Sequence, residues 1–293
     1  MKHAIKTRRE LLRKIAVPTD FSLGSTSAMD YALALARPYK SKVIALHAVD
    51  PFEYSFGPKD LRSLKKQEVW ARAQEEMSQW LKTNKFSADA TSVIEGEAGP
   101  AIAQFIEQKN IDFTVLGTSA RRQAARLLLG SVAEEIFRST SCNVLVIGPR
   151  MRSLHWRPLK RLVFATALEA HSLAVLSRLS KLARKFDSTI SVIRAVHPDL
   201  KSRTERNRIR EETYLKSEAA ADSALRKRIK KIQVEFGNPV KVITGFANAS
   251  KADAIVMGVR SGGDWDRATT HVPWALAHRV IADARCPVLT MRG

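Results

Sequence analysis

Short apolar runs alternate along this chain with longer stretches in which apolar residues recur at helical spacing. In the first half, the apolar runs cover residues 14–20, 42–50, 112–117 and 142–147. Continuous runs of this length are typical of strands that are buried on both faces of a sheet. Their alternation with helical patterns requires right-handed crossovers between parallel strands, so the sequence predicts an α/β fold with a doubly wound parallel sheet.

The chain repeats this order of patterns. Further apolar runs cover residues 161–167, 189–197, 253–258 and 286–291, at nearly the spacing of the first set. So many matches in one order indicate a tandem duplication, and we expect two domains, residues 1–150 and 151–293. Between them, residues 149–158 are bounded by prolines and lack periodicity, as expected of a linker.

Long segments that mix polar and apolar residues fill the middle of each half. Residues 62–83 carry apolar side chains at helical spacing, and residues 203–231 form a longer and much more basic segment. The stretch 243–253 is shorter than the matching stretch 94–112. We therefore expect the third helix of the second half to be cut to one or two turns.

The composition fits two globular domains of ordinary size. The chain has 293 residues, of which 45 % are hydrophobic. No apolar run reaches the ~18 residues needed to cross a bilayer, and the basic N-terminus lacks the apolar segment of a secretory signal. Only Cys142 and Cys286 are present, too few for a disulfide framework. We therefore expect a cytoplasmic protein that is not attached to membranes.

Net charge is the unusual feature of the composition. The chain has 49 basic and 29 acidic residues, a net charge of +20 and an isoelectric point near 10.3. Such an excess attracts nucleic acid, anionic membranes or polyphosphate. It also suits a solvated surface, which charge alone favours, and the basic segments lack interleaved aromatic residues that could stack on bases. Nucleic acid is therefore an alternative partner and not the favoured one.

Glycines and one acidic residue occur where the first-half strands end. In a doubly wound sheet, ligands bind at the carboxyl ends of the strands. Asp20 follows the first strand, and Gly117 ends the fourth. Gly130 and Ser131 open a helix that runs through residue 138, and its first amides can bind an anion. These features predict a nucleotide pocket. The alternative is structural: the glycines serve tight turns and helix packing, and Asp20 caps a helix.

Three motifs resemble those of the universal stress protein family in a tandem two-domain form. They are PTDFS after the first strand, LHAVD at the end of the second, and GTSA followed by nine residues and GS. The resemblance covers essentially the whole chain after the first dozen residues. It implies two domains of the universal stress protein fold, which is similar to that of the adenine nucleotide alpha hydrolases, and a role in stress response.

The ATP-binding branch of that family carries the motif G-x-x-G, nine residues, then G-S/T. The resemblance implies that Asp20, with Pro18 and Thr19, lies at the nucleoside end of the pocket. The backbone of Ala48 would then lie near the base, and Gly117 would pass close to the ribose.

The same resemblance assigns the phosphates to Gly130, Ser131 and the N–H of Val132. The ligand would be ATP or AMP, and Mg²⁺ could accompany it. The sequence departs from the motif at Ala120, which replaces the second glycine. A methyl group at this position is harmless if φ is negative and obstructs the ligand if φ is positive. Arg121 follows directly and could supply compensating charge.

The second half has lost these features. Ala167 stands where Asp20 stands in the first half, and alignment on the last helix places Trp274 opposite Gly130. A tryptophan at that position would keep a phosphate away from the helix amides. We expect this half to bind no nucleotide and to serve as a structural partner for the first half or to recognise another molecule.

The resemblance also implies how the halves meet. Universal stress proteins commonly dimerise through their last strand, and in tandem members the two halves pair within one chain. We expect residues 142–147 and 286–291 to pair about a pseudo-twofold axis, which leaves a homodimer of whole chains open. Edge strands carry unpaired N–H and C=O groups that favour such pairing.

No catalytic motif accompanies the predicted pocket. The histidines form no H-E-x-x-H pair, and both the G-x-S-x-G elbow and the P-loop lysine are absent. Without an evident general base or carboxylate pair, we expect at most slow ATP hydrolysis. The predicted function is stress-linked nucleotide sensing or scaffolding, in which bound nucleotide alters a surface read by an unidentified protein partner. The alternatives are a basic module that binds nucleic acid or another polyanion, and a structural module without a ligand.

Overall fold

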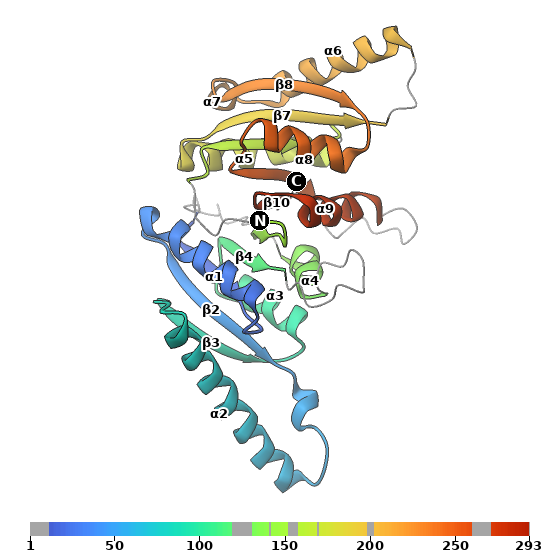
Figure 1. Cartoon of the computed structure of the whole chain (residues 1–293). Helices are drawn as coiled ribbons and strands as arrows, with labels where there is room; N and C mark the ends of the chain where they lie inside the picture. Colours follow the sequence, from blue (N-terminus) through green and yellow to red (C-terminus); the bar gives the residue numbers. More distant parts are fainter. Residues whose placement is uncertain are drawn as a thin grey trace, which may run out of the picture.

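A single ten-stranded sheet runs through the molecule (Figure 1). The computed structural model describes residues 12–118, 131–140, 142–151, 158–168, 170–197, 202–259 and 271–292. The strand order is β3-β2-β1-β4-β5-β10-β9-β6-β7-β8, and every pairing is parallel except that of β5 with β10. The predicted α/β class is confirmed.

Each half contributes five of these strands. Those of the first half are β1 (Lys14–Pro18), β2 (Lys42–Val49), β3 (Ala90–Glu95), β4 (Phe113–Gly117) and β5 (Asn143–Ile147). Those of the second half are β6 (Arg161–Ala165), β7 (Thr189–Val196), β8 (Ile229–Phe236), β9 (Ala254–Val259) and β10 (Val288–Arg292).

Helices occupy the connections between the strands. In the first half they are α1 (Leu23–Ala36), η1 (Arg37–Tyr39), η2 (Pro51–Tyr54), α2 (Lys59–Thr83), α3 (Ala98–Gln108) and α4 (Ser131–Ser139). In the second half they are α5 (Ala170–Phe186), α6 (Arg203–Ala220), α7 (Ser223–Arg226), α8 (Pro239–Ala249) and α9 (His271–Asp283).

The helices cover both faces of the sheet, and each face has its own core. In β1, Ile15 and Val17 pack in the core shared with α1 and α5, whereas Ala16 packs in the core shared with α3 and α8. This alternation follows from the two-residue period of a strand. Because both faces are buried, the central strands are apolar at every position, which explains the continuous runs in the sequence.

The two halves repeat the same local contacts, and the tandem duplication is confirmed. The Asp112 carboxylate accepts hydrogen bonds from the N–H groups of Arg13 and Lys14, each at 3.0 Å, where β1 begins. The Asp253 carboxylate accepts the equivalent two hydrogen bonds, at 3.1 and 2.8 Å, where β6 begins. Each aspartate therefore joins the start of the first strand of its half to the start of the fourth.

The halves are joined within one chain by their last strands, as predicted. β5 and β10 pair antiparallel, with Leu145 opposite Leu289, and both side chains are fully buried. On one face of this junction the rings of Tyr39 and Phe186 pack edge to face, with their centroids 5.2 Å apart. At the end of β5, a Cβ on Gly148 would lie 2.3 Å from the carbonyl oxygen of Ile281, so the glycine allows α9 to approach closely.

The prediction for the third helix of the second half was wrong. That helix is α8, and it has 11 residues, as many as α3. The error arose because the preceding strand, β8, begins within the basic segment 203–231 and was not recognised as a strand. β8 is an edge strand and reads IKKIQVEF, so charged side chains interrupt its apolar run. Ile243, which was matched to a position in β3, belongs to α8.

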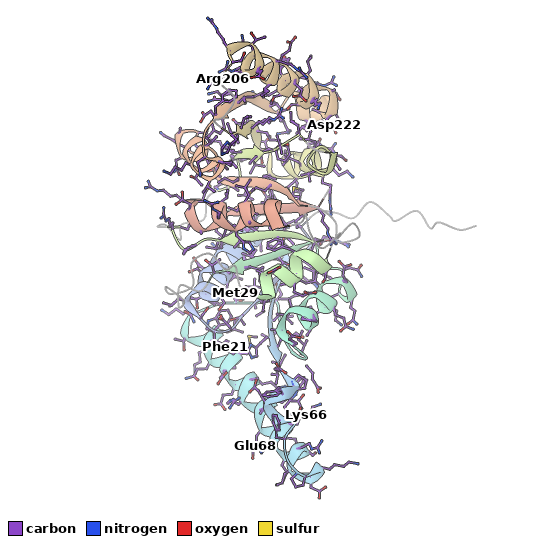
Figure 2. The ribbon with its side chains drawn as sticks, turned by 90° about the vertical axis from the view of Figure 1, so that its right-hand side faces the viewer. Phe21, Met29, Lys66, Glu68, Arg206 and Asp222 are labelled. Carbon is purple, nitrogen blue, oxygen red and sulfur yellow. The ribbon has the colours of Figure 1, made fainter. Side chains whose placement is uncertain are left out.

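The longest helices lie at opposite ends of the molecule. α2 extends beside β3, and α6 lies beside β8 (Figures 1 and 2). Most of the first half of α2 is exposed to solvent, including Leu61 and Leu64. In the part of the chain that the structure describes, no helix combines the length and apolar character needed to span a bilayer.

Candidate functional site

The chain turns sharply after β1, and a buried threonine holds the turn. The N–H of Thr19 donates to the carbonyl oxygen of Leu46 at 2.8 Å, and its hydroxyl oxygen accepts from the N–H of Phe21 at 2.9 Å. Phe21 has a φ of 59°, in the left-handed region that residues other than glycine rarely adopt. The turn places Asp20 directly outside the end of β1, after Pro18 and before α1.

Asp20 is exposed, and among the described residues only one of its carboxylate oxygens accepts hydrogen bonds. Its Oδ1 accepts hydrogen bonds from the N–H of Ser22 at 3.1 Å and from the hydroxyl of Ser25 at 3.0 Å. Oδ2 accepts no hydrogen bond from any residue that the structure describes. Partial burial raises the pKa of Asp20, but the hydrogen bonds from Ser22 and Ser25 lower it by more, so the net pKa lies below its usual value. At neutral pH the carboxylate is ionised and has one oxygen available.

Aromatic side chains pack together at this turn. The rings of Phe21 and His47 lie 4.5 Å apart, and those of Phe21 and Trp80 lie 6.0 Å apart. Nδ1 of His47 lies 2.8 Å from the Thr19 carbonyl oxygen, and it must donate because a carbonyl only accepts. Trp80 donates from Nε1 to the Thr26 hydroxyl at 3.0 Å, which ties α2 to α1. These contacts hold the Asp20 backbone in one position.

The backbone of Ala48 faces the region beyond the carboxyl end of β1. The pairing of β1 with β2 ends at Pro18 and Leu46, and the Leu46 carbonyl oxygen accepts from Thr19. Peptide groups two residues apart in a strand point the same way, so those of Ala48 also point toward the β1 side. The chain has already turned away there. The Ala48 peptide groups are therefore directed at the region outside the turn, next to Asp20.

Gly117 lies against the first turn of α1. A Cβ on Gly117 would lie only 1.8 Å from the carbonyl oxygen of Gly24, a distance that no side chain could tolerate. This close approach explains the glycine without any ligand, as the structural alternative expected. It also places the end of β4 beside the same turn of α1 that holds Asp20 through Ser25. The structure therefore brings Asp20 and Gly117 to one place.

The phosphate end of the predicted pocket is described only in part. Ser131 and Val132 begin α4, and Val132 is half-buried against the core on the α3 side of the sheet. α4 packs against α3 and follows β4 in the chain, so it begins on the carboxyl side of the sheet. Ala120 and Gly130 lie outside the described residues.

The second half repeats the turn without its carboxylate. The N–H of Thr166 donates to Ile193 at 3.1 Å, and its hydroxyl oxygen accepts from the N–H of Leu168 at 2.9 Å. Leu168 has a φ of 63°, almost that of Phe21. Ala167 therefore occupies the position that Asp20 occupies in the first half. The side chain that would face a nucleoside there is a methyl group.

The described part of the last helix begins at Ser131 in the first half and at His271 in the second. The alignment of Trp274 with Gly130 stays a prediction, because Gly130 lies outside the described residues.

Neither cysteine has the lowered thiol pKa of a reactive nucleophile. Burial raises the pKa of the Cys142 thiol to about 12, and burial also raises that of Cys286 to about 12. Cys142 lies 3.3 Å from the Thr114 hydroxyl in the core. Within the described ranges, no group of three or more histidine, cysteine, aspartate or glutamate side chains could hold a metal ion.

Topology, duplication and strand-end motifs agree with one family. The universal stress protein family matches residues 12–148 and again residues 158–292. The chain belongs to the universal stress protein family. A universal stress protein of Methanocaldococcus jannaschii is 31 % identical over 152 residues, which are 49 % of this chain and 86 % of that protein. A second one from the same organism is 24 % identical over 165 residues, covering 47 % of this chain and 95 % of that protein.

The arrangement of both halves also occurs in a solved structure of this family. A crystal structure of a universal stress protein from Archaeoglobus fulgidus superimposes with a TM-score of 0.66 and 17 % identity. The match covers 96 % of this chain and 98 % of that one. At this identity the likeness establishes the fold of the tandem universal stress protein and nothing about its ligand.

Sequence reasoning missed the residues that organise the turn. Ser22 and Ser25 fix the Asp20 carboxylate, and Ser22 also caps α1 by accepting from the N–H of Ser25. One signal was available. Thr19 recurs as Thr166 at the same place in the repeat, although the residue that follows it changes. A threonine kept in both copies indicated a role in the turn itself.

Proposed function

We propose that this universal stress protein binds an adenine nucleotide, ATP or AMP, in its first half alone. The observation that carries the proposal is the difference between two otherwise matching turns. Asp20 presents an ionised carboxylate with a free oxygen at the end of β1, and Ala167 presents a methyl group at the end of β6. A turn built alike in both halves needs no carboxylate for its fold, which favours a ligand role for Asp20.

The neighbouring groups suit the nucleoside part of such a ligand. Oδ2 of Asp20 can accept hydrogen bonds from ribose hydroxyls, which are donors. The peptide groups of Ala48, directed at the same region, can pair with the edge of a base. Gly117 adds no side chain that would fill the space next to α1. The proposed site needs no movement of these residues.

The phosphates would extend toward the start of α4. Amides at a helix N-terminus attract anions, and those of Ser131 and Val132 are the proposed donors. Ala120 and Gly130 would complete this end of the site. Mg²⁺ would enter with ATP through phosphate oxygens, since the described residues offer no cluster of carboxylates for it.

A sensing or scaffolding role fits this site better than rapid turnover. Among the described residues, no histidine or carboxylate is arranged as a general base toward the proposed phosphate position. An apolar patch adjoins the end of β2, where Phe52 and Phe56 pack edge to face and are 67 % and 59 % exposed. We propose that a protein partner binds this patch and that nucleotide occupancy alters it.

The test is substitution of one carboxylate oxygen. In Asp20→Asn the amide oxygen can still accept from Ser22 and Ser25, so the turn should persist, while the ionised oxygen is lost. We expect the affinity for ATP to fall about tenfold. The measurement is the ATP-dependent rise in unfolding temperature of the purified protein.

The matched control is Asp30→Asn, which removes an exposed carboxylate from α1 outside the proposed site. It should leave the affinity for ATP unchanged. Equal ATP affinity for Asp20→Asn and the unchanged protein, or no effect of ATP on either, would refute the proposed site. An adenine nucleotide released from the denatured purified protein would give independent support.

A further inference from the structure

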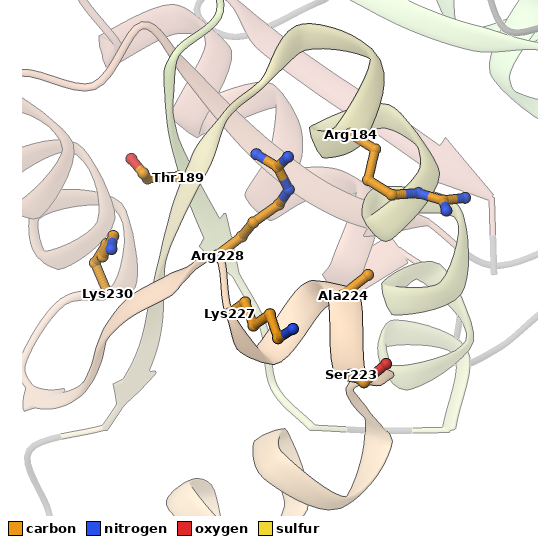
Figure 3. Close-up of a pocket in the computed structure, with 7 residues that line it drawn as sticks. All are labelled: Arg184, Thr189, Ser223, Ala224, Lys227, Arg228 and Lys230. Carbon is orange, nitrogen blue, oxygen red and sulfur yellow. The ribbon is translucent and has the colours of Figure 1, made fainter.

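A second candidate site lies in the second half, away from the strand ends described above. It is a surface depression of about 470 Å³ (Figure 3). Its lining consists of Arg184, Thr189, Ser223, Ala224, Lys227, Arg228 and Lys230. Arg184 lies in the last turn of α5, Thr189 begins β7, and Lys230 lies near the start of β8. The depression therefore lies at the amino ends of β7 and β8, at the opposite end of the second-half strands from the turn that holds Ala167.

The lining is strongly cationic. Four of its residues carry a positive charge and none carries a negative one. Arg228 is held in place, since its guanidinium donates to Asp187 and to the Ser188 carbonyl oxygen, both at 3.1 Å. Figure 3 shows the Arg228 side chain between Thr189 and Arg184. A fixed arginine at the centre of a depression is preorganised to bind an anion.

In the described part of the chain, no carboxylate lies within ion-pair distance of Lys227 or Lys230, and Arg184 interacts with the Asp222 carboxylate only at longer range. The nearby Asp222 carboxylate is already occupied, because it accepts from the N–H of Leu225 at 2.7 Å and from a serine hydroxyl at 2.9 Å. Charges of one sign that are only partly compensated repel each other in a concave surface and raise the positive potential there.

The first half matches this lining only in part: Arg37 stands where Arg184 stands, but the cations of residues 227–230 have no counterpart. The residues that lead into β8 are Lys227, Arg228, Ile229 and Lys230, and those that lead into β3 are Ala88, Asp89, Ala90 and Thr91. In the first half, Asp89 accepts a hydrogen bond from the N–H of Val43 at 2.7 Å and closes the sheet edge. The fold therefore does not require the cations at residues 227–230, which belong to the second half alone.

We infer that this depression binds an oligophosphate, a small anion with several adjacent phosphate groups. Several separated cations match a ligand with several charges better than a single carboxylate. The lining contains no aromatic side chain, so the site offers no platform on which a base could stack. Its volume is in the range of small-molecule sites. The phosphate chain could be free or part of a nucleotide.

The experiment measures tripolyphosphate binding to the full chain by titration calorimetry at constant ionic strength of about 0.15 M. The test variant is Lys227→Gln with Lys230→Gln, which removes two exposed charges without touching the core. The matched control is Lys82→Gln with Lys241→Gln, two exposed lysines elsewhere. We expect about tenfold weaker binding in the test variant and less than about twofold change in the control.

Further measurements ask which phosphate compounds bind, and they distinguish this site from the proposed nucleotide site. ATP should compete with tripolyphosphate, and adenosine should not. Asp20→Asn should leave tripolyphosphate affinity unchanged, so failure here and failure of the nucleotide proposal are distinguishable. Equal tripolyphosphate affinity in the test and control variants, or none in the unchanged protein, would overturn the inference. So would binding of duplex DNA that depends on Lys227 and Lys230 when tripolyphosphate does not bind.

Discussion

At the scale of single residues, two glycines show how differently the same residue type can be used. Gly117 lies where a Cβ would meet the Gly24 carbonyl oxygen at 1.8 Å. Gly245 lies inside α8, is exposed, and has no heavy atom within 4 Å of a Cβ built on it. The sequence singled out Gly117 correctly as a position of close approach. It could not reveal that the approaching atoms belong to α1.

We predict opposite effects of the same substitution at these two sites. Gly117→Ala should lower the free energy of unfolding by about 3 kcal/mol or more, because β4 and α1 would have to separate. Gly245→Ala should raise it by roughly 0.5–1 kcal/mol, because alanine loses less backbone entropy in a helix. Chemical denaturation of both variants measures the difference. A Gly117→Ala protein as stable as the parent would show that β4 and α1 are not packed this closely.

At the scale of elements, the exposed first half of α2 is held by a small polar cluster. Glu95, at the end of β3, accepts from the Tyr54 hydroxyl at 2.5 Å and pairs with the Lys66 ammonium at 2.7 Å. The hydrogen bonds from Lys66 and Tyr54 hold the pKa of Glu95 below its usual value. Because the folded-state pKa is lowered, the stabilisation is present above the ordinary glutamate pKa. It is lost as the pH falls through the lower pKa of the folded protein.

We therefore predict that Glu95→Gln loosens the start of α2. Amide hydrogen exchange in residues 59–66 should become about two- to fivefold faster at neutral pH, in keeping with a partly exposed ion pair. Glu75→Gln, which changes an exposed glutamate of α2 that has no ion pair with any described residue, should have no effect. At pH values below the Glu95 pKa, the parent and Glu95→Gln should exchange alike after correction for intrinsic rates. Unchanged exchange in Glu95→Gln at neutral pH would count against this role of the cluster.

The strands that the sequence predicts are buried on both faces, and those that it does not predict lie at the edges of the sheet. The central strands are buried on both faces, so their residues form continuous apolar runs that the sequence shows directly. β8 lies at the edge and carries charged residues along its length, so its pattern does not separate it from the basic segment that precedes it. The strand-end residue Asp20 was predicted from its place after β1. The serines that orient its carboxylate were not, since hydrogen bonds within a turn leave no periodic pattern.

At the scale of the whole molecule, the antiparallel pairing of β5 with β10 makes one sheet from two copies of a unit. The edge strands through which copies would otherwise pair are satisfied within the chain. The two copies differ at different places: the first has Asp20 at the carboxyl end of β1, and the second has the cationic depression at the amino ends of β7 and β8. The +20 net charge predicted neither site, because Arg184 and Lys227 meet only after folding.

The most direct test of a nucleotide site in one half only is photolabelling with 8-azidoadenosine triphosphate. An excess of tripolyphosphate is added to occupy the cationic depression, and the labelled peptides are mapped by mass spectrometry. We predict that the label falls on peptides from residues 12–150, next to Ala48 or Asp20, and that unlabelled ATP displaces it. Labelling of peptides from residues 158–292 under these conditions, or labelling that ATP does not displace, would contradict the proposal.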